Sequence, residues 1–216
     1  RVEIYDDAEV QDFIGTYEPQ WPLLDLSNPK TYGPLDFYDY YYEHKRQQIE
    51  AMENATPVIL DVAKTFNERF DRNYGLFEAY RLDDADVAVV VANSTAGTTK
   101  TVVDQLRDEG LKVGMLKIRL FRPFPAEELA QALSHLEAVA VMDRSVSFGA
   151  MDNAGPLYVE FMAALTAYGV EMPMMDYVYG LGGRDILPRE IERVFRDALA
   201  AAETGEVERK VTYLSV

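Results

Sequence analysis

Small hydroxyl-bearing residues follow an apolar run near the middle of the chain. The run Val87-Ala88-Val89-Val90-Val91-Ala92 leads into Asn93-Ser94-Thr95-Ala96-Gly97-Thr98-Thr99. Such a run favours a buried strand, and the residues after it favour the start of a helix, whose free amides could bind an anion. The segment is neither a P-loop nor a GxGxxG fingerprint. The structural alternative is that Ser94, Thr95 and Gly97 form an N-cap and a tight turn.

Basic residues gather after the next predicted strand. Lys117, Arg119 and Arg122 lie within six residues, in a chain that is otherwise acidic. They could bind a phosphate or a carboxylate. The structural alternative is that Arg119 and Arg122 pair with carboxylates of neighbouring loops or of another subunit, and Asp143 supplies such a partner.

Two further segments complete this set of polar residues. Asp143-Arg144 ends a third predicted strand, and Gly180 to Asp185 follows a fourth, with glycines that permit positive φ or close backbone approach. Ligands of open parallel sheets bind at the carboxyl ends of strands. The candidate residues for an anion site or an interface are Ser94, Thr95, Gly97, Thr98, Arg119, Arg122, Asp143, Arg144, Gly182, Arg184 and Asp185.

The residue types argue against catalysis by this chain alone. His44 lies in a predicted helix and His135 ends another; neither adjoins a serine or cysteine nucleophile, so both are expected to be solvated helix residues. The chain has no cysteine, which excludes disulfides and iron–sulfur ligation by cysteine. Two histidines are too few to favour a zinc site. We expect no catalytic and no metal-binding residue.

Composition restricts the partners. With 37 acidic and 21 basic residues the formal charge is −16, which disfavours nucleic acid and anionic membrane surfaces. No apolar run reaches the roughly 20 residues that span a bilayer. The first residues lack a signal peptide, so we expect a cytoplasmic protein, and a start without methionine suggests a piece of a longer polypeptide.

The amino-terminal part differs from the rest. Residues 1–34 contain four prolines and are predicted to be an extended arm that lies on another surface. Helical patterns begin near Leu35 and again at Thr56-Pro57, which suit an N-cap and a first helical position. Aromatic residues at 37–42 surround the first helix, so it is either fully buried locally or buried against a missing domain.

From residue 86 onward the sequence alternates strands and helices. Strands are predicted at 87–92, 112–120, 138–142 and 171–178, with a possible edge strand at 209–216. The helices between them show apolar residues at three- and four-residue steps. The predicted fold is α/β, with a mainly parallel sheet between helix layers, preceded by the arm and its helices.

Five segments carry a family resemblance, in the family's order. These segments resemble the alpha subunit of pyruvate synthase, or pyruvate:ferredoxin oxidoreductase. They are Tyr41-Tyr42-Glu43-His44-Lys45-Arg46-Gln47-Gln48, Ser94-Thr95-Ala96-Gly97-Thr98, Gly114-Met115-Leu116-Lys117-Ile118-Arg119-Leu120-Phe121-Arg122-Pro123-Phe124, Asp143-Arg144-Ser145-Val146-Ser147-Phe148-Gly149 and Tyr179-Gly180-Leu181-Gly182-Gly183-Arg184-Asp185.

The resemblance implies a domain division and a fold. Residues 81–216 would form a domain like the transketolase carboxy-terminal domain, a three-layer mixed sheet with one antiparallel edge strand. Residues 1–80 would be an arm and helical connector from a pyrimidine-binding domain that is missing here.

The resemblance also implies an assembly role. The whole complex would oxidatively decarboxylate pyruvate to acetyl-CoA, or run in reverse, with thiamine diphosphate, magnesium, iron–sulfur clusters, coenzyme A and ferredoxin. No cofactor would be bound by this chain. Its partners would be the missing amino-terminal alpha domain and the beta, gamma and delta subunits or equivalent domains, with ferredoxin reached through the complex.

Alternatives to this reading remain. The chain could be an independent anion- or nucleotide-binding α/β module that uses the turn at 94–99, or a self-sufficient small enzyme. It could also belong to an oxidoreductase for 2-oxoglutarate or branched-chain oxoacids, because this domain does not form the pocket that selects the oxoacid.

Overall fold

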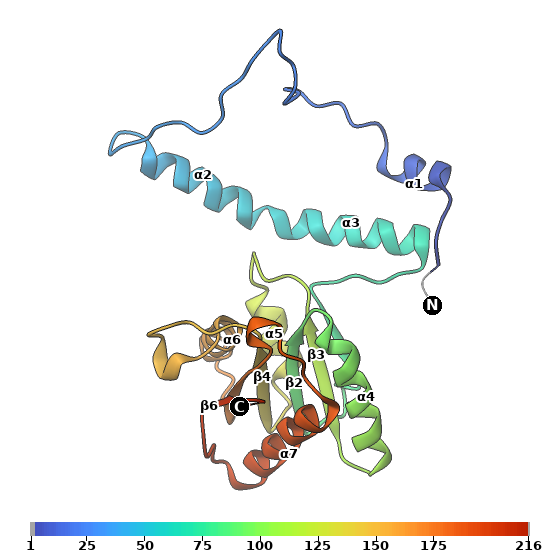
Figure 1. Ribbon diagram of the computed structural model, residues 1–216, viewed down its shortest axis with the longest axis vertical. Helices are drawn as coiled ribbons and strands as arrows, with labels where there is room; N and C mark the ends of the chain where they lie inside the picture. Colours follow the sequence, from blue (N-terminus) through green and yellow to red (C-terminus); the bar gives the residue numbers. More distant parts are fainter. Residues whose placement is uncertain (1–2, 216) are drawn as a thin grey trace. The chain divides into compact units, whose positions relative to one another are not determined.

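The computed structural model describes residues 3–215, in two compact units, Arg1–Gln47 and Gln48–Val216 (Figure 1). Residues 1, 2 and 216 lie outside the described part. The expectations about the first residues, and about Val216 as the end of an edge strand, therefore stay predictions.

The first unit contains one short helix that the sequence analysis missed. Helix α1 (Asp7–Ile14) begins after Asp6, whose side chain accepts the Glu9 N–H at 2.8 Å. It ends at Gly15, which has a φ of 76° and donates its N–H to the Gln11 carbonyl. The prediction that residues 1–34 are extended throughout is wrong here, because capping by Asp6 makes a helix out of a polar segment. Residues 16–40 form neither helix nor strand.

Helices α2 (Tyr41–Glu53) and α3 (Ala55–Phe70) follow each other with only Asn54 between them. The prediction of an N-cap at Thr56 is wrong, because α3 already begins at Ala55. Asn54 has helical dihedral angles and makes no capping bond through its side chain. Pro57 has no N–H to donate to the carbonyl four residues earlier, which explains why the hydrogen-bond ladder is interrupted at this point.

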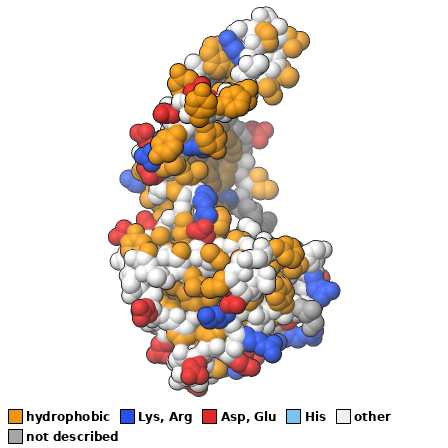
Figure 2. Space-filling model, turned by 90° about the vertical axis from the view of Figure 1, so that its left-hand side faces the viewer, with side chains coloured by type: hydrophobic (Ala, Val, Ile, Leu, Met, Phe, Trp, Pro, Cys, Tyr) orange, Lys and Arg blue, Asp and Glu red, His pale blue; other side chains and the backbone are white. Residues whose placement is uncertain are grey.

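The aromatic residues around the start of α2 are exposed. Tyr38 and Tyr42 are 101% and 73% exposed, and α2 contains no buried residue. Figure 2 shows hydrophobic side chains gathered over the part of the molecule that carries the arm and α2. The alternative in which this helix is fully buried locally is therefore wrong.

A six-stranded sheet forms the centre of the second unit. Its order is β1-β3-β2-β4-β5-β6; β1 runs antiparallel to β3, and all other neighbours are parallel. The predicted α/β fold with a mixed, mainly parallel sheet is confirmed, including the antiparallel edge strand. The strands are β1 (Phe77–Tyr80), β2 (Val87–Ala92), β3 (Val113–Ile118), β4 (Ala138–Asp143), β5 (Met174–Val178) and β6 (Val211–Tyr213).

Some strand boundaries differ from the predictions. Strands β3 and β5 are shorter than 112–120 and 171–178, and within the segment 209–216 the strand is Val211–Tyr213. Strand β1 was not predicted from its own residues, because four residues with mixed exposure show no clear alternation.

Helices cover both faces of the sheet (Figure 1). Helices α4 (Thr95–Asp108) and α7 (Pro188–Thr204) pack on the face that carries Val87, Val89 and Val91. Helices α5 (Ala126–Leu133) and α6 (Pro156–Ala167) pack on the face that carries Ala88 and Val90. Burial on two faces explains why β2 reads as an uninterrupted apolar run. Short 3₁₀ turns, η1 (Met151–Asn153) and η2 (Leu181–Gly183), lie in loops after β4 and β5.

The two histidines occupy different environments. His44 lies in α2, as predicted, and its ring bonds to Asp36. His135 lies beyond the end of α5, and its Nε2 is 2.9 Å from the Leu82 carbonyl oxygen. His135 is exposed, as expected, but it lies in the turn that follows α5 and not in the helix. Among residues 3–215, no helix combines the length and hydropathy that crossing a membrane requires.

Candidate functional site

The carboxyl ends of β2, β3, β4 and β5 border a cavity of about 330 Å³. We call it the strand-end cavity. Its polar lining includes five of the eleven candidate residues: Ser94, Thr95, Arg119, Asp143 and Arg144. The remaining lining residues are Ala92, Asn93, Ile118, Phe121, Met142, Ser145, Pro156, Leu157 and Tyr179.

The other six candidate residues do not line this cavity. Gly97 and Thr98 lie in the first turn of α4, while Gly182 lies in η2. Arg184 donates to the Ser215 carbonyl, and Asp185 is exposed. Positive φ angles of 65° at Gly180 and 66° at Gly182 confirm that this loop uses its glycines for conformations that other residues disfavour.

The start of α4 is not capped as the structural alternative proposed. Ser94 occupies the N-cap position with helical dihedral angles, and its side chain makes no capping bond. The N–H groups of Ala96 and Gly97 donate instead to the carbonyls of Asn93 and Ser94, at 3.4 and 3.1 Å. The Thr95 hydroxyl accepts a hydrogen bond from Tyr179 across the cavity floor, at 2.9 Å. The prediction of N-capping by the Ser94 side chain is therefore wrong.

Arg119 is held by residues that precede it by about forty positions. Its guanidinium donates to Glu78 at 2.7 Å and to the Asn73 carbonyl at 3.0 Å, and it lies 4.8 Å from the centre of the Tyr74 ring. Lys100 also bonds to Glu78. The prediction that Arg119 pairs with a carboxylate is confirmed, although the partner lies on strand β1 and not in a loop.

Glu78 is the shared partner of this basic group. Burial by itself would raise the pKa of Glu78, but the hydrogen bond and charge of Lys100 and the charges of Arg119 and Lys117 lower it overall. The carboxylate therefore stabilises the fold above its unfolded pKa, and this stabilisation is lost as the pH falls through its lowered folded pKa.

We expect Glu78→Gln to lower the free energy of unfolding at pH 7 by about 2 kcal/mol, because it leaves Arg119 and Lys100 without their anion in a half-buried position. Urea unfolding measures this change. The matched control is Glu171→Gln, at an exposed carboxylate, which should change stability by less than about 0.5 kcal/mol. Equal effects of the two variants would contradict the assigned role of Glu78.

Arg122 is also paired, while Asp143 is not the partner that was expected. Arg122 bonds to Glu160 of α6 and to the Phe121 carbonyl, and its guanidinium lies 4.2 Å from the centre of the Phe121 ring. Asp143 turns toward the start of α6, where its two oxygens accept the N–H groups of Leu157 and Tyr158, at 3.1 and 2.9 Å. The prediction that Asp143 serves the arginines is wrong, because the unpaired amides of α6 bind it first.

Asp176 is a buried carboxylate that the sequence analysis missed. Asp176 lies on β5, the strand next to the one that carries Asp143, and it is 0% exposed. Its Oδ2 accepts the Gly155 N–H at 2.6 Å. Its Oδ1 has no hydrogen-bond partner among the described residues. Burial, with a further contribution from Asp143, raises the pKa of Asp176 to about 7. The available signal was a charged residue inside the apolar run Met174-Met175-Asp176-Tyr177-Val178.

The described lining of the strand-end cavity contains one carboxylate and no histidine, which does not suit acid–base catalysis. Asp143 is engaged with α6, and burial raises its pKa. Neither histidine lines the cavity. Within residues 3–215 no group of three or more His, Cys, Asp or Glu side chains could hold a metal ion. The arrangement suits binding or contact better than chemistry on a substrate.

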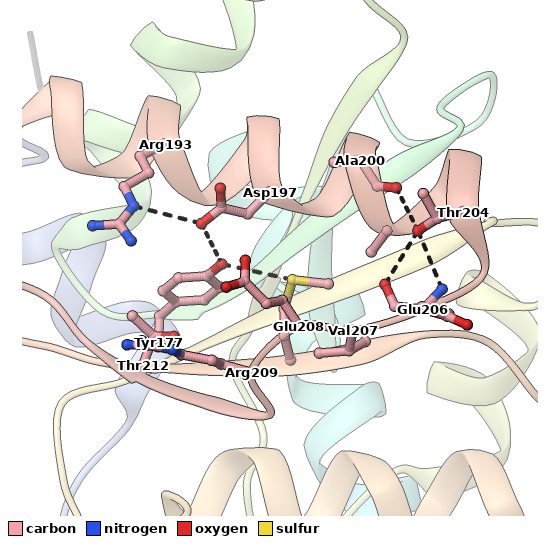
Figure 3. Close-up of a pocket in the computed structure, with 12 residues that line it drawn as sticks. Tyr177, Arg193, Asp197, Ala200, Thr204, Glu206, Val207, Glu208, Arg209 and Thr212 are labelled. Atoms are coloured by element: carbon pink, nitrogen blue, oxygen red, sulfur yellow. Dashed lines mark hydrogen bonds and ion pairs between the residues drawn. The ribbon is translucent and has the colours of Figure 1, made fainter.

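A second cavity, of about 360 Å³, lies along α7 beside β5 and β6 (Figure 3). The Tyr177 hydroxyl donates to Asp197 at 2.8 Å, and Arg193 lies 3.6 Å from the same carboxylate. Thr204 closes the end of α7 with a bond to the Ala200 carbonyl. Burial and Asp197 raise the pKa of Tyr177, so the phenol stays protonated. Because these central polar groups are paired with one another, we assign this cavity a structural role.

Comparison with known proteins identifies several relatives. The chain is 52% identical over 198 residues to the pyruvate synthase subunit PorA of Thermotoga maritima, covering 92% of this chain and 50% of that one. It is 38% identical to the ketoisovalerate oxidoreductase subunit VorA of Pyrococcus horikoshii, covering 94% and 51%. The chain therefore spans about half the length of the curated relatives it matches.

Two solved structures are similar to part of this chain. A 2-oxoglutarate:ferredoxin oxidoreductase from Magnetococcus marinus has a TM-score of 0.46 and 22% identity, covering 62% of this chain and 23% of that one. A split-gene transketolase has a TM-score of 0.46 and 15% identity, covering 64% and 45%. Residues 85–191 match the family model described as pyruvate:ferredoxin oxidoreductase core domain II, and the chain belongs to this family.

Proposed function

We propose that this chain is a non-catalytic assembly domain of a thiamine diphosphate-dependent 2-oxoacid:ferredoxin oxidoreductase. The whole complex would oxidatively decarboxylate pyruvate to acetyl-CoA, or run in reverse, with ferredoxin as electron carrier. The observation that carries the proposal is 52% identity to a pyruvate synthase subunit over 92% of the chain. An independent anion-binding module or a self-sufficient small enzyme would not require this relationship.

The residues of the chain do not suit an iron–sulfur cluster. Iron–sulfur clusters are ligated mainly by cysteine thiolates, and the sequence contains none. The clusters would therefore lie in other parts of the complex, and we propose that thiamine diphosphate, magnesium and coenzyme A are bound there as well.

The exposed arm supports an assembly role. Leu23, Leu24 and Leu26 are each at least 85% exposed, and Tyr38 is fully exposed. Large apolar side chains gathered in this way mark surfaces that bind another protein. We propose that residues 1–80 form the connector from a pyrimidine-binding domain and that residues 81–216 form the compact domain.

The proposed partners follow from this arrangement. They are the missing amino-terminal alpha domain and the beta, gamma and delta subunits or their equivalents, with ferredoxin reached through the complex. We place the assembly in the cytoplasm.

The proposed substrate is pyruvate. Identity to the pyruvate synthase subunit is 52%, against 38% to the ketoisovalerate oxidoreductase subunit. The 2-oxoglutarate and branched-chain alternatives are therefore less well supported.

The test is reconstitution of the complex. We expect this chain to bind the separately expressed amino-terminal alpha domain and the beta subunit, and pyruvate-dependent viologen reduction to require the assembled complex. Turnover of pyruvate by the chain alone would contradict the proposal, as would failure to bind either partner.

A pair of variants tests the role of the arm. We expect Tyr38→Ala with Tyr42→Ala to weaken binding at least tenfold, because both rings would be buried in the complex. The matched control is Tyr168→Ala, which removes a ring that is 50% exposed at the end of α6. Pull-down titration gives both affinities. Unchanged binding by the double variant would contradict the assigned contact.

A further inference from the structure

Arg144 is the unpaired cation of the strand-end cavity. The three other described arginines at this edge are engaged, Arg119 with Glu78, Arg122 with Glu160 and Arg184 with the Ser215 carbonyl. Within residues 3–215, no carboxylate lies within ion-pair distance of Arg144, and its one hydrogen bond runs from Nε to the Gly180 carbonyl at 3.4 Å. Its charge is therefore available to a ligand.

Polar side chains without intramolecular partners stand beside it. Asn93, Ser94 and Ser145 line the same cavity, and their side chains make no hydrogen bond to another described residue. The one carboxylate in the lining, Asp143, uses both oxygens for amides of α6. The lining thus offers hydrogen-bond donors and an unneutralised positive charge, in a chain whose formal charge is −16.

Apolar groups complete the lining. Ile118, Met142 and Leu157 are at least 94% buried, and the Phe121 ring is 39% exposed. A cavity of about 330 Å³ lies at the lower end of the range for small-molecule sites, which combine apolar walls with a few polar groups. An anion with an apolar body fits this combination better than a bare inorganic ion.

The backbone of the loop after β5 lies close to the Arg144 side chain. Gly180 has a φ of 65°, and a Cβ atom there would lie 3.0 Å from the Arg144 Nε. The glycine therefore allows the arginine side chain to lie close to the loop after β5. The Arg144 Nε thus contacts the Gly180 carbonyl, while its two terminal nitrogens remain available for a bidentate contact.

We propose that the strand-end cavity binds a small organic anion, a phosphate or carboxylate on an apolar body, with Arg144 as the anchoring cation and Ser94 and Ser145 as hydrogen-bond donors. The assembly role proposed above does not depend on this site.

The test uses the whole 216-residue chain without partner subunits. Phenyl phosphate, benzoate and inorganic phosphate are titrated by NMR, following the amide signals of Ser94, Thr95 and Ser145. We expect saturable binding of an aromatic anion, at least tenfold weaker in Arg144→Ala and less than twofold weaker in Arg122→Ala. Arg122 is the matched control because it has the same charge at the same edge but is paired and does not line the cavity.

Comparison of the probes identifies the anion. Tighter binding of phenyl phosphate supports a phosphate ligand, and tighter binding of benzoate supports a carboxylate. Absence of saturable binding overturns the proposal, and so does equal weakening by the two arginine variants, which would reveal only a general charge effect. Inorganic phosphate binding as tightly as phenyl phosphate would overturn the role of the apolar wall. Ser94→Ala with Ser145→Ala, which preserves the charge, should still weaken binding at least threefold.

Discussion

Asp176→Asn should raise the free energy of unfolding at pH 8 by up to about 4 kcal/mol while changing it little at pH 4. The reason is the cost of burying a charge: burial raises the pKa of Asp176 from 3.8 to about 7. A carboxyl group of this kind stabilises the fold fully below its unfolded pKa, and the stabilisation is lost as the pH rises through its folded pKa. A difference of roughly three pKa units corresponds to about 4 kcal/mol.

Asparagine has nearly the shape of the protonated acid and carries no charge. Its amide oxygen can accept the Gly155 N–H in place of Oδ2. Urea unfolding of the variant and the wild-type chain from pH 4 to pH 8 measures the difference at each pH. A difference that stays constant over this range would show that Asp176 is not protonated in the folded protein.

Asp143→Asn is the matched control, and its expected effect has the opposite sign. Both oxygens of Asp143 accept backbone N–H groups, one from Leu157 and one from Tyr158. Asparagine can accept only one of these hydrogen bonds, because its NH₂ group would point its own donors at the second N–H. We expect a loss of about 2 kcal/mol at pH 7. Two neighbouring strands thus carry buried carboxylates with different functions: Asp143 caps α6, whereas burial disfavours the charged form of Asp176.

Gly155→Ala should destabilise the protein by at least about 3 kcal/mol or prevent folding. The φ of Gly155 is −73°, which any residue adopts, so the constraint is steric. A Cβ atom there would overlap the Cβ, Cγ and Oδ2 atoms of Asp143, far inside van der Waals contact. Asp143 is 4% exposed and held by two amides, so it has no alternative position that keeps its hydrogen bonds.

Gly97→Ala provides the matched control for this substitution. A Cβ atom at Gly97 meets no atom within 4 Å, and the residue lies in the first turn of α4. Alanine there should be neutral or stabilise by up to about 1 kcal/mol. Thermal and urea unfolding of both variants measure the contrast. A Gly155→Ala protein as stable as Gly97→Ala would show that α6 does not approach β4 as closely as the structure indicates.

These two predictions concern the buried residues that hold the start of α6 against β4 and β5, beside the strand-end cavity. Asp143 and Leu157 belong to the cavity lining, and Gly155 allows the carboxylate to reach the helix start. Asp143, which was predicted to pair with the arginines, therefore holds the start of α6 in place instead. Its engagement with α6 leaves Arg144 as the charged group that a ligand can reach.

The sequence by itself determined the core of the fold. Strand β2, and strand β4 up to Met142, are uninterrupted apolar runs because helices cover both of their faces. Helix α7 shows Ile191, Val194, Phe195 and Ala198 at helical spacing, and all four are buried. Patterns of this kind arise from local periodicity and from burial, so they can be read without knowing which segments become neighbours.

Tertiary structure decided which polar residues meet. Arg119 finds Glu78 across the antiparallel pair of β1 and β3, a contact between residues 41 positions apart. Strand β1 carries no clear pattern of its own and exists because β3 offers it an edge.

Asp143 and Asp176 lie on neighbouring strands of the sheet, and the direction in which α6 starts selects them as partners for its amides. The sequence placed candidate residues at the strand ends, but the choice between ion pair, helix cap and unpaired cation depends on three-dimensional neighbours. Electrostatic and hydrogen-bond partners act over a few ångströms in space, and sequence spacing does not encode that distance.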